Sequence, residues 1–131
     1  MVPSGGVPHP NSPANGRKSI LLVEDEVMVR MMIADKLREA GYTVIEAANA
    51  HEALEVLQHD VDVRAILSDV RMPGTIDGVG LARTVRSQYP AVKIMLASGH
   101  LPSLDWAEHD GFFPKPYDVE AVIRYIKTLL D

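Results

Sequence analysis

Short apolar runs and helically spaced apolar positions alternate along this chain from about residue 19 to its end. Five runs are short and bounded by turns, and most are rich in branched or aromatic residues, as expected of buried strands: 20–23, 42–47, 65–69, 93–97 and 112–113. After most of them the period changes to that of an amphipathic helix. The alternation predicts an α/β fold, in which a parallel sheet carries helices on both faces and the connections are right-handed.

Four stretches show the apolar stripe of an amphipathic helix. We expect these side chains to face the core: Val29, Met32, Ile33, Leu37 and Ala40; Ala50, Ala53, Leu54 and Leu57; Leu81, Ala82 and Val85; Val119, Val122, Ile123, Ile126, Leu129 and Leu130. Gly41 supplies the stop of the first helix, and Asn49 with Glu52 marks the start of the second. Asp77 and Asp118 are expected to cap the third helix and the last one.

The segment between the fourth and fifth strands is too short for a regular helix. The offset from Ser98 to Phe112 is 14, and two connecting loops must fit into it besides the helix. Pro102 comes early, Gly111 comes late, and few apolar residues have helical spacing. We therefore predict that the helix here is short, irregular or replaced by a loop, with one turn at 103–106.

Composition narrows the possible classes. The chain has 131 residues, of which 47% are hydrophobic, enough for one domain with an adequate core. Its net charge of −5 provides no basic face, so we expect neither direct nucleic-acid binding nor a membrane partner. Cysteine is absent, which excludes disulfides and thiolate metal sites and suits a reducing cytoplasm. The longest apolar stretches are far too short to span a bilayer.

Residues 1–17 differ from the rest of the chain. They contain four prolines and several glycines, show no apolar periodicity, and lack the basic start and apolar middle of a signal peptide. We interpret 1–17 as a flexible leader and 18–131 as the folded domain.

Polar side chains follow four of the predicted strands where each strand ends. The first strand leads into Glu24 and Asp25, the third into Asp69, the fourth into Ser98 and the fifth into Lys115. In a parallel sheet all these ends lie at the same edge. Three carboxylates held together invite a cation, and their hard oxygen atoms suit Mg²⁺ better than zinc. A hydroxyl and an ammonium beside them would bind phosphoryl oxygen atoms, so the set points to phosphoryl transfer onto a carboxylate.

Each of these residues also has a simpler explanation. Asp69 could form a turn, Glu24 and Asp25 could cap a helix, Ser98 could lie in an ordinary turn, and Lys115 could be a solvated surface residue. Their coincidence at the matching strand ends favours a common site.

The order of these motifs resembles that of the receiver domain of two-component response regulators. The matching elements are Glu24-Asp25 after the first strand, D-V-R-M-P at 69–73, Ser98-Gly99, and Lys115-Pro116. The similarity covers about 18–131. It implies a flavodoxin-like, doubly wound sheet of five parallel strands in the order 2-1-3-4-5. We interpret the chain as a stand-alone receiver of the chemotaxis type, or as one excised from a larger protein.

The resemblance also implies a role for each site residue. Asp69 would be the phosphoacceptor, attacking a phosphohistidine or a small acyl phosphate. Asp25 would bind Mg²⁺ directly, Glu24 would bind it through water, and Asp69 and the backbone carbonyl of Arg71 would complete the protein ligands. The partners would be a histidine kinase or a histidine phosphotransfer protein and an unknown downstream target. The chain would be no enzyme beyond catalysing its own phosphorylation and dephosphorylation.

Three further positions belong to the switch in this interpretation. Ser98 would bind the phosphoryl group, Lys115 would pair with Asp69 or its phosphate, and Phe112 would be the aromatic ring that moves inward. The Lys115–Pro116 peptide is expected to be cis. Two departures from the family pattern stand out: the turn after Asp69 is one residue longer than the commonest form, and Ser98 is smaller than threonine.

Two other classes of protein fit part of the pattern. An aspartate-nucleophile phosphatase would need a second acid two residues after the nucleophile, where this chain has Arg71. A receiver-like interaction module that takes no phosphoryl group usually lacks part of the acid cluster or the lysine, and this chain has both.

Overall fold

Five parallel strands form the centre of the protein. The computed structural model describes residues 19–59, 62–99 and 109–130. Its strands are β1 (Ser19–Val23), β2 (Thr43–Ala47), β3 (Val63–Asp69), β4 (Lys93–Ser98) and β5 (Gly111–Pro114). They pair in the order β2-β1-β3-β4-β5, and every pair is parallel. The predicted fold class and strand order are confirmed.

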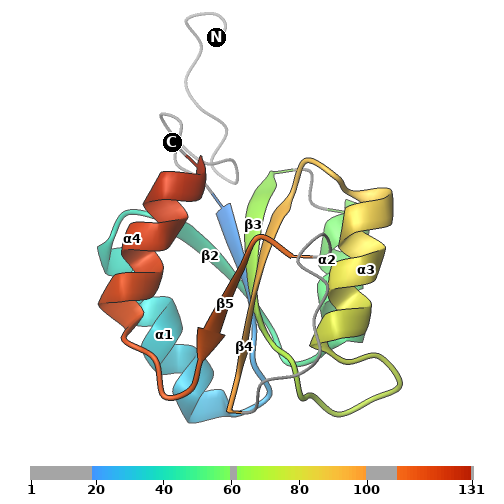
Figure 1. Ribbon diagram of the computed structural model, residues 1–131, viewed down its shortest axis with the longest axis horizontal. Helices are drawn as coiled ribbons and strands as arrows, with labels where there is room; N and C mark the ends of the chain where they lie inside the picture. Colours follow the sequence, from blue (N-terminus) through green and yellow to red (C-terminus); the bar gives the residue numbers. More distant parts are fainter. Residues whose placement is uncertain (1–18, 60–61, 100–108, 131) are drawn as a thin grey trace, which may run out of the picture.

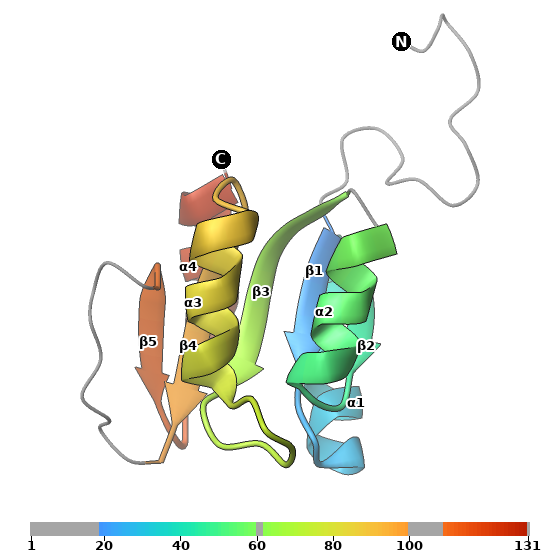
Figure 2. The same ribbon diagram turned by 90° about the vertical axis from the view of Figure 1, so that its right-hand side faces the viewer.

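Helices cover both faces of the sheet. In the described part of the chain they are α1 (Val27–Glu39), α2 (Ala50–His59), α3 (Gly78–Gln88) and α4 (Val119–Leu130). Figure 1 shows α1 and α4 on one face and α2 with α3 on the other, and Figure 2 shows α2 and α3 in front of the sheet. None of these helices is both long enough and apolar enough to cross a membrane.

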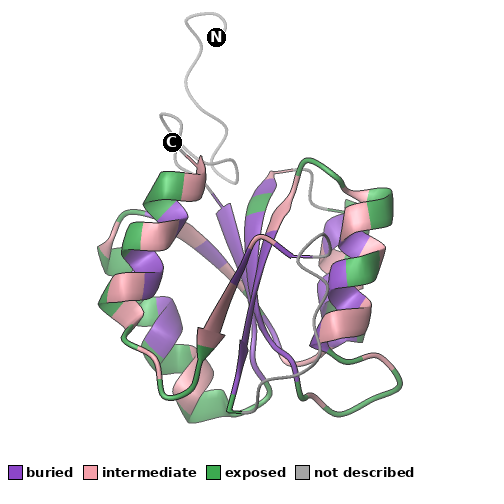
Figure 3. Cartoon of the chain, in the orientation of Figure 1, coloured by how far each residue is buried: buried purple, intermediate pink, exposed green. Residues whose placement is uncertain are grey.

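The sheet separates two apolar cores, because alternate side chains of a strand point to opposite faces. Leu21 and Ile66 belong to the core under α2 and α3. Their neighbours Ile20, Ala65 and Leu67 belong to the core under α1 and α4. Figure 3 shows the central strands β1, β3 and β4 almost entirely buried, whereas the edge strands β2 and β5 are only partly buried. The strands that carry the site are therefore fixed by close packing of a core on each face of the sheet.

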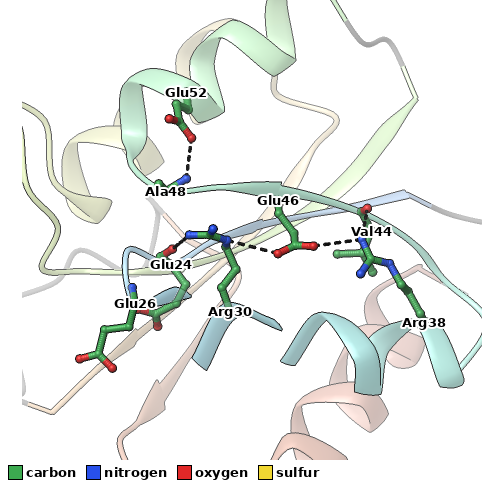
Figure 4. Close-up of polar contacts among 8 residues, drawn as sticks. All are labelled: Glu24, Glu26, Arg30, Arg38, Val44, Glu46, Ala48 and Glu52. Carbon is green, nitrogen blue, oxygen red and sulfur yellow. Dashed lines mark hydrogen bonds and ion pairs between the residues drawn. The ribbon is translucent and has the colours of Figure 1, made fainter. Parts of the chain in front are cut away.

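The predicted helix boundaries at Gly41 and Asn49 are confirmed. Gly41 has a positive φ of 102°, a conformation that glycine adopts easily after a helix. The Asn49 side chain accepts a hydrogen bond from the Glu52 N–H at 2.9 Å. The Glu52 carboxylate in turn accepts one from the Ala48 N–H at 2.8 Å (Figure 4). The first bond satisfies a donor in the first turn of α2, and the second satisfies the N–H of a residue that precedes the helix.

The two predicted aspartate caps are also present. Asp77 accepts a hydrogen bond from the Gly80 N–H at 2.9 Å at the start of α3. Asp118 accepts one from the Glu120 N–H at 3.0 Å before α4.

One predicted core position of α1 is wrong. Met32 is 55% exposed, whereas Ile33, Ala34 and Leu37 are buried. Two residues along an α-helix turn it by about 200°, so Met32 and Ala34 face opposite sides. The core takes Ala34, and Met32 therefore lies outside.

Two sequence-based predictions fall outside the described residues. The leader 1–17 is one of them, and the short or irregular helix between β4 and β5, at 100–108, is the other. The label α4 here belongs to the C-terminal helix.

Candidate functional site

The predicted site residues meet at one edge of the sheet. Since the strands are parallel, their carboxyl ends lie together, and the arrowheads in Figures 1 and 2 point the same way. Glu24 and Asp25 follow β1, Asp69 ends β3, Ser98 ends β4 and Lys115 follows β5. The register brings the ends of neighbouring strands level with one another.

Three carboxylates form an acidic cluster there. One oxygen atom from each of Glu24, Asp25 and Asp69 lies within 4.8 Å of the other two. Glu24 and Asp69 are buried, with 4% and 9% exposed, while Asp25 is exposed. Octahedral Mg²⁺ with bonds of about 2.1 Å spaces its ligand oxygen atoms about 3 to 4 Å apart. An all-oxygen set at nearly this spacing, open to solvent on one side, fits Mg²⁺ and its remaining waters.

Lys115 supplies the positive charge of the site. Its ammonium forms an ion pair with Oδ1 of Asp69 and lies 3.6 Å from Oε1 of Glu24. Burial alone would lower the pKa of the Lys115 ammonium. The hydrogen bond and the charge of Asp69, together with Glu24, outweigh burial, and the pKa is raised above its ordinary value. The lysine therefore stays charged at any physiological pH.

The surroundings of Glu24 disfavour the charged form of its carboxyl group. Burial raises the pKa of its carboxyl group to about 7, and the hydrogen bond and charge of nearby Asp69 act in the same direction. The Glu26 N–H, which donates to Glu24 Oε2 at 3.0 Å, and the charge of Lys115 oppose the rise. A bound cation would favour the ionised form.

A pocket opens beside Asp69. Its volume is about 240 Å³, and its walls are formed by Asp69, Arg71, Ala97, Ser98, Gly99 and Lys115. Ala97 and Gly99 have small side chains or none, which leaves room for a phosphoryl group next to the carboxylate. Ser98 is buried, and its carbonyl oxygen accepts a hydrogen bond from the Lys115 N–H at 2.9 Å. The ends of β4 and β5 are thus joined at the pocket.

Phe112 lies away from this pocket. It is half-buried and packs against the core under α2 and α3, and the part of the chain described here does not place it in the pocket wall. Its role as the switch aromatic stays a prediction. The Lys115–Pro116 peptide is cis, as the resemblance implies.

Gly78 is a supporting residue that sequence reasoning missed. A Cβ atom at Gly78 would lie 2.1 Å from the carbonyl oxygen of Asp69 and 2.8 Å from Cα of Val70. The Gly78 N–H donates to the Val70 carbonyl at 2.7 Å. Only glycine lets α3 begin this close behind the acidic strand end. The D-G pair at 77–78 was the available signal, but it was interpreted as a cap alone.

Two further neighbours of the cluster had no sequence signal. Burial raises the pKa of the Tyr117 hydroxyl far above its ordinary value, and the charges of Asp69 and Glu24 add to the effect. The guanidinium of Arg30 donates to the backbone carbonyl of Glu24 (Figure 4). Both contacts depend on how a helix or loop packs against the sheet, which no spacing reveals.

An apolar surface lies next to the acidic site. The exposed large apolar residues of α1 are Val27, Met28, Met31 and Met32, which we call the methionine face. A groove of about 490 Å³ runs beside it, lined by Glu26, Val29, Met32, Ile33, Lys115, Pro116, Tyr117 and Val119. Lys115 lines both the groove and the pocket beside Asp69, so the two surfaces are continuous.

Comparison with known proteins identifies the family. Residues 20–127 match the family model of the response regulator receiver domain. The chain belongs to the receiver domain family. Receiver domains are signalling domains of two-component systems that interact with histidine kinases or phosphotransfer proteins, and they bind Mg²⁺ at an acidic pocket. In this receiver the acidic pocket is the cluster of Glu24, Asp25 and Asp69.

Curated relatives are much longer than this receiver. It is 37% identical over 125 residues to the sensor kinase CckA of Brucella abortus, a match that covers 89% of this chain and 13% of CckA. It is 33% identical over 111 residues to the C4-dicarboxylate transport transcriptional regulatory protein DctD of Rhizobium meliloti, covering 81% of this chain and 24% of DctD. The chain thus spans a quarter or less of these relatives.

Solved structures show the same domain. The crystal structure of the receiver domain from the hybrid histidine kinase CckA has a TM-score of 0.72 and 36% identity, covering 86% of this chain and 99% of that one. The response regulator TrrA of Thermotoga maritima, in complex with Mg(2+)-BeF, has a TM-score of 0.79 and 28% identity, covering 86% and 99%.

Proposed function

We propose that this receiver accepts a phosphoryl group on Asp69 from the phosphohistidine of a histidine kinase or a phosphotransfer protein, in a reaction that depends on Mg²⁺. The proposal rests on one observation, the set of groups that the structure brings together around the Asp69 carboxylate. Its buried carboxylate pairs with Lys115, lies beside two further carboxylates, and opens onto a pocket that Ser98 also lines.

The chemistry needs a nucleophile and compensation of charge. An oxygen atom of Asp69 attacks the phosphorus atom, the new O–P bond forms as the P–N bond of the donor breaks, and the leaving imidazole takes up a proton from solvent. Bound Mg²⁺ would offset the negative charge on the phosphoryl oxygen atoms. Asp25, Asp69 and the backbone carbonyl of Arg71 would hold it directly, and Glu24 would hold it through water.

Lys115 and Ser98 would then hold the product. The Lys115 ammonium can move from the Asp69 carboxylate to a phosphoryl oxygen, and the Ser98 hydroxyl can donate to another. Because the Ser98 carbonyl is bonded to the Lys115 N–H, a shift of Ser98 toward the phosphoryl group is passed to β5, where Phe112 lies. We propose that this movement changes the affinity for a downstream protein.

The phosphodonor would dock on the methionine face. The donor histidine must come within bonding distance of Asp69, so its protein must cover the surface around the pocket. The methionine face and its groove reach Lys115 from α1. Contiguous exposed apolar residues mark interaction surfaces, and flexible methionine side chains adapt to a partner.

Phosphorylation of Asp69 can be tested with acetyl phosphate, which needs no partner protein. Incubation with acetyl phosphate and Mg²⁺, followed by intact mass measurement, should add one phosphoryl group to the wild-type chain and none after chelation of Mg²⁺. Asp69→Asn should abolish the gain. Asp77→Asn, a change to an exposed acid that still caps α3, should retain it. A wild-type chain without any gain would favour the alternative, a receiver-like module that takes no phosphoryl group.

A further inference from the structure

We infer that Arg30 is a positioning residue for the cation site: it holds the backbone carbonyl of Glu24 and so fixes the turn that presents Asp25. The inference rests on the proposed function at the same site, and it assigns a role to a residue that belongs neither to the acidic cluster nor to the wall of the pocket beside Asp69.

The Arg30 guanidinium joins three elements. Its Nη1 donates to the Glu24 carbonyl oxygen at 2.8 Å, and its Nε donates to Oε1 of Glu46 at 3.2 Å. Figure 4 shows the side chain extending from α1 between the end of β1 and the carboxylate on β2. The planar guanidinium directs its donors at fixed angles, so the two bonds together set the position of the group.

Glu46 is itself held from the other side. Arg38, two turns further along α1, donates to Oε2 of Glu46 at 3.2 Å and to the Val44 carbonyl at 3.0 Å. The carboxylate of Glu46 therefore lies between two guanidinium groups of one helix, and α1 is attached to β2 along its length. Both Arg30 and Arg38 bind the Glu46 carboxylate, and Arg30 also binds the backbone carbonyl of Glu24.

The carbonyl of Glu24 matters because it orients the next residue, Asp25. The Glu24 carbonyl and the Asp25 N–H belong to one rigid peptide plane, so a bond to the oxygen fixes the direction in which the chain enters Asp25. The Glu24 N–H donates to the Ala47 carbonyl at 3.0 Å. With Arg30 in place, both backbone polar groups of Glu24 are hydrogen-bonded to neighbouring elements. The backbone at Asp25 is therefore fixed, and with it the position from which the exposed Asp25 carboxylate extends.

The charge of Arg30 and its positioning role predict opposite changes in the affinity for Mg²⁺ when Arg30 is replaced. A guanidinium near the acidic cluster repels a divalent cation, so removing its charge should tighten Mg²⁺ binding. Positioning predicts weaker binding instead, because the carboxylates lose their arrangement. The sign of the change therefore separates the two explanations.

The test is a MgCl₂ titration of the full, unphosphorylated chain. The changes in amide chemical shifts during the titration give the dissociation constant for Mg²⁺. Arg30→Met should raise the dissociation constant for Mg²⁺ by about 10-fold, the usual effect of removing a group that orients a metal ligand. Arg38→Met is the matched control, since it removes the same charge and a bond to the same carboxylate. It should change the constant by less than about two-fold. Arg30→Met binding as tightly as Arg38→Met, or more tightly, overturns the inference.

A second variant keeps the test decisive if Arg30→Met does not fold. Arg30→Lys retains the charge, but a single ammonium cannot reproduce the fork that reaches both Glu24 and Glu46. Weaker Mg²⁺ binding by Arg30→Lys supports positioning, whereas unchanged binding overturns it.

Phosphorylation gives an independent readout. With acetyl phosphate, the Arg30 variants should need more Mg²⁺ for half-maximal rate but reach a maximal rate close to that of the wild type. A lowered maximal rate with an unchanged Mg²⁺ requirement overturns the inference. A wild-type chain that neither binds Mg²⁺ nor gains a phosphoryl group removes the proposed function and this inference together, whereas normal wild-type behaviour shared by the Arg30 variants removes this inference alone.

Discussion

The first residue of α3, Gly78, lies against the main chain of Asp69 so closely that no side chain fits between them. A Cβ atom would come within 2.1 Å of the Asp69 carbonyl oxygen, and backbone atoms on both sides cannot swing away as a flexible side chain can. The helix and the end of the acidic strand are therefore packed as one unit, and the position of Asp69 depends on Gly78.

Gly78→Ala should destabilise the fold and impair phosphorylation together. Forced overpacking costs about 1–3 kcal/mol or more, only partly offset by the better helix propensity of alanine, about 1 kcal/mol. Urea denaturation should show a net loss of the free energy of unfolding, and the acetyl phosphate assay should show a slower mass gain. Gly99→Ala is the control for stability alone, because a Cβ atom there meets no atom of the described residues within 4 Å, whereas its place in the pocket wall excludes it as a control for the rate of mass gain. Equal stability of the two variants would contradict the steric argument.

Lys115→Ala should change switching more than stability. Its side chain is 34% exposed, so solvent screens part of its attraction to the two carboxylates. Loss of the ammonium also leaves the clustered carboxylates uncompensated, which Mg²⁺ can relieve. We expect an unfolding free energy near that of the wild type with Mg²⁺ present, but loss of the phosphorylation-induced amide shifts in β5. A variant with normal shifts in β5 would refute a switching role for the lysine.

The stability of the metal-free protein should fall as pH rises through the neutral range. Burial raises the pKa of Glu24 from 4.5 to about 7 in the folded state, so the folded state binds this proton more tightly than the unfolded state does. Stability is then greatest below about pH 4.5 for this group and decreases as pH rises through about 7. Chemical denaturation with a chelator present, at several values between about pH 5 and 8, measures the trend.

A matched variant and added metal separate the Glu24 effect from other titrations. Glu24→Gln should flatten the decline in stability, because it removes the titrating group. Saturating Mg²⁺ should also reverse it, since the cation binds the ionised carboxylate. A decline of equal slope in Glu24→Gln would assign the effect to other groups.

Positive charges placed on the methionine face should slow phosphoryl transfer from a donor protein but leave phosphorylation by acetyl phosphate unchanged. Met28 is 77% exposed and Met31 is 51% exposed, so Met28→Lys with Met31→Lys leaves the core intact. Transfer from a phosphorylated histidine phosphotransfer protein that serves the wild type should slow by about 10-fold or more, as for loss of interface anchors. The rate with acetyl phosphate should stay unchanged. Gln58→Lys with Gln88→Lys, on α2 and α3, adds the same charge elsewhere, and equal inhibition by that pair would rule out a specific face.

The sequence by itself predicted the five strands, the helices described here and the meeting of the candidate site residues, and the strand order came from the resemblance to receiver domains. Short continuous apolar runs predicted the five strands, because both faces of a parallel sheet are buried, and helical periodicity predicted the helices described here. The convergence of Glu24, Asp25, Asp69, Ser98 and Lys115 came from topology alone. Parallel strands bring their carboxyl ends to one edge, whatever the details of packing.

Tertiary structure decided the features that depend on how each element is rotated and how closely it is packed. Periodicity placed Met32 inside, but the rotation of α1 about its own axis buried Ala34 and exposed Met32. The contact of Arg30 with the Glu24 carbonyl requires α1, β1 and β2 to meet, and the clash behind Asp69 requires the actual distance of Gly78. A linear pattern carries the period of a helix but neither its rotation nor its distance from a neighbour, because both are set by packing against residues far away in the chain.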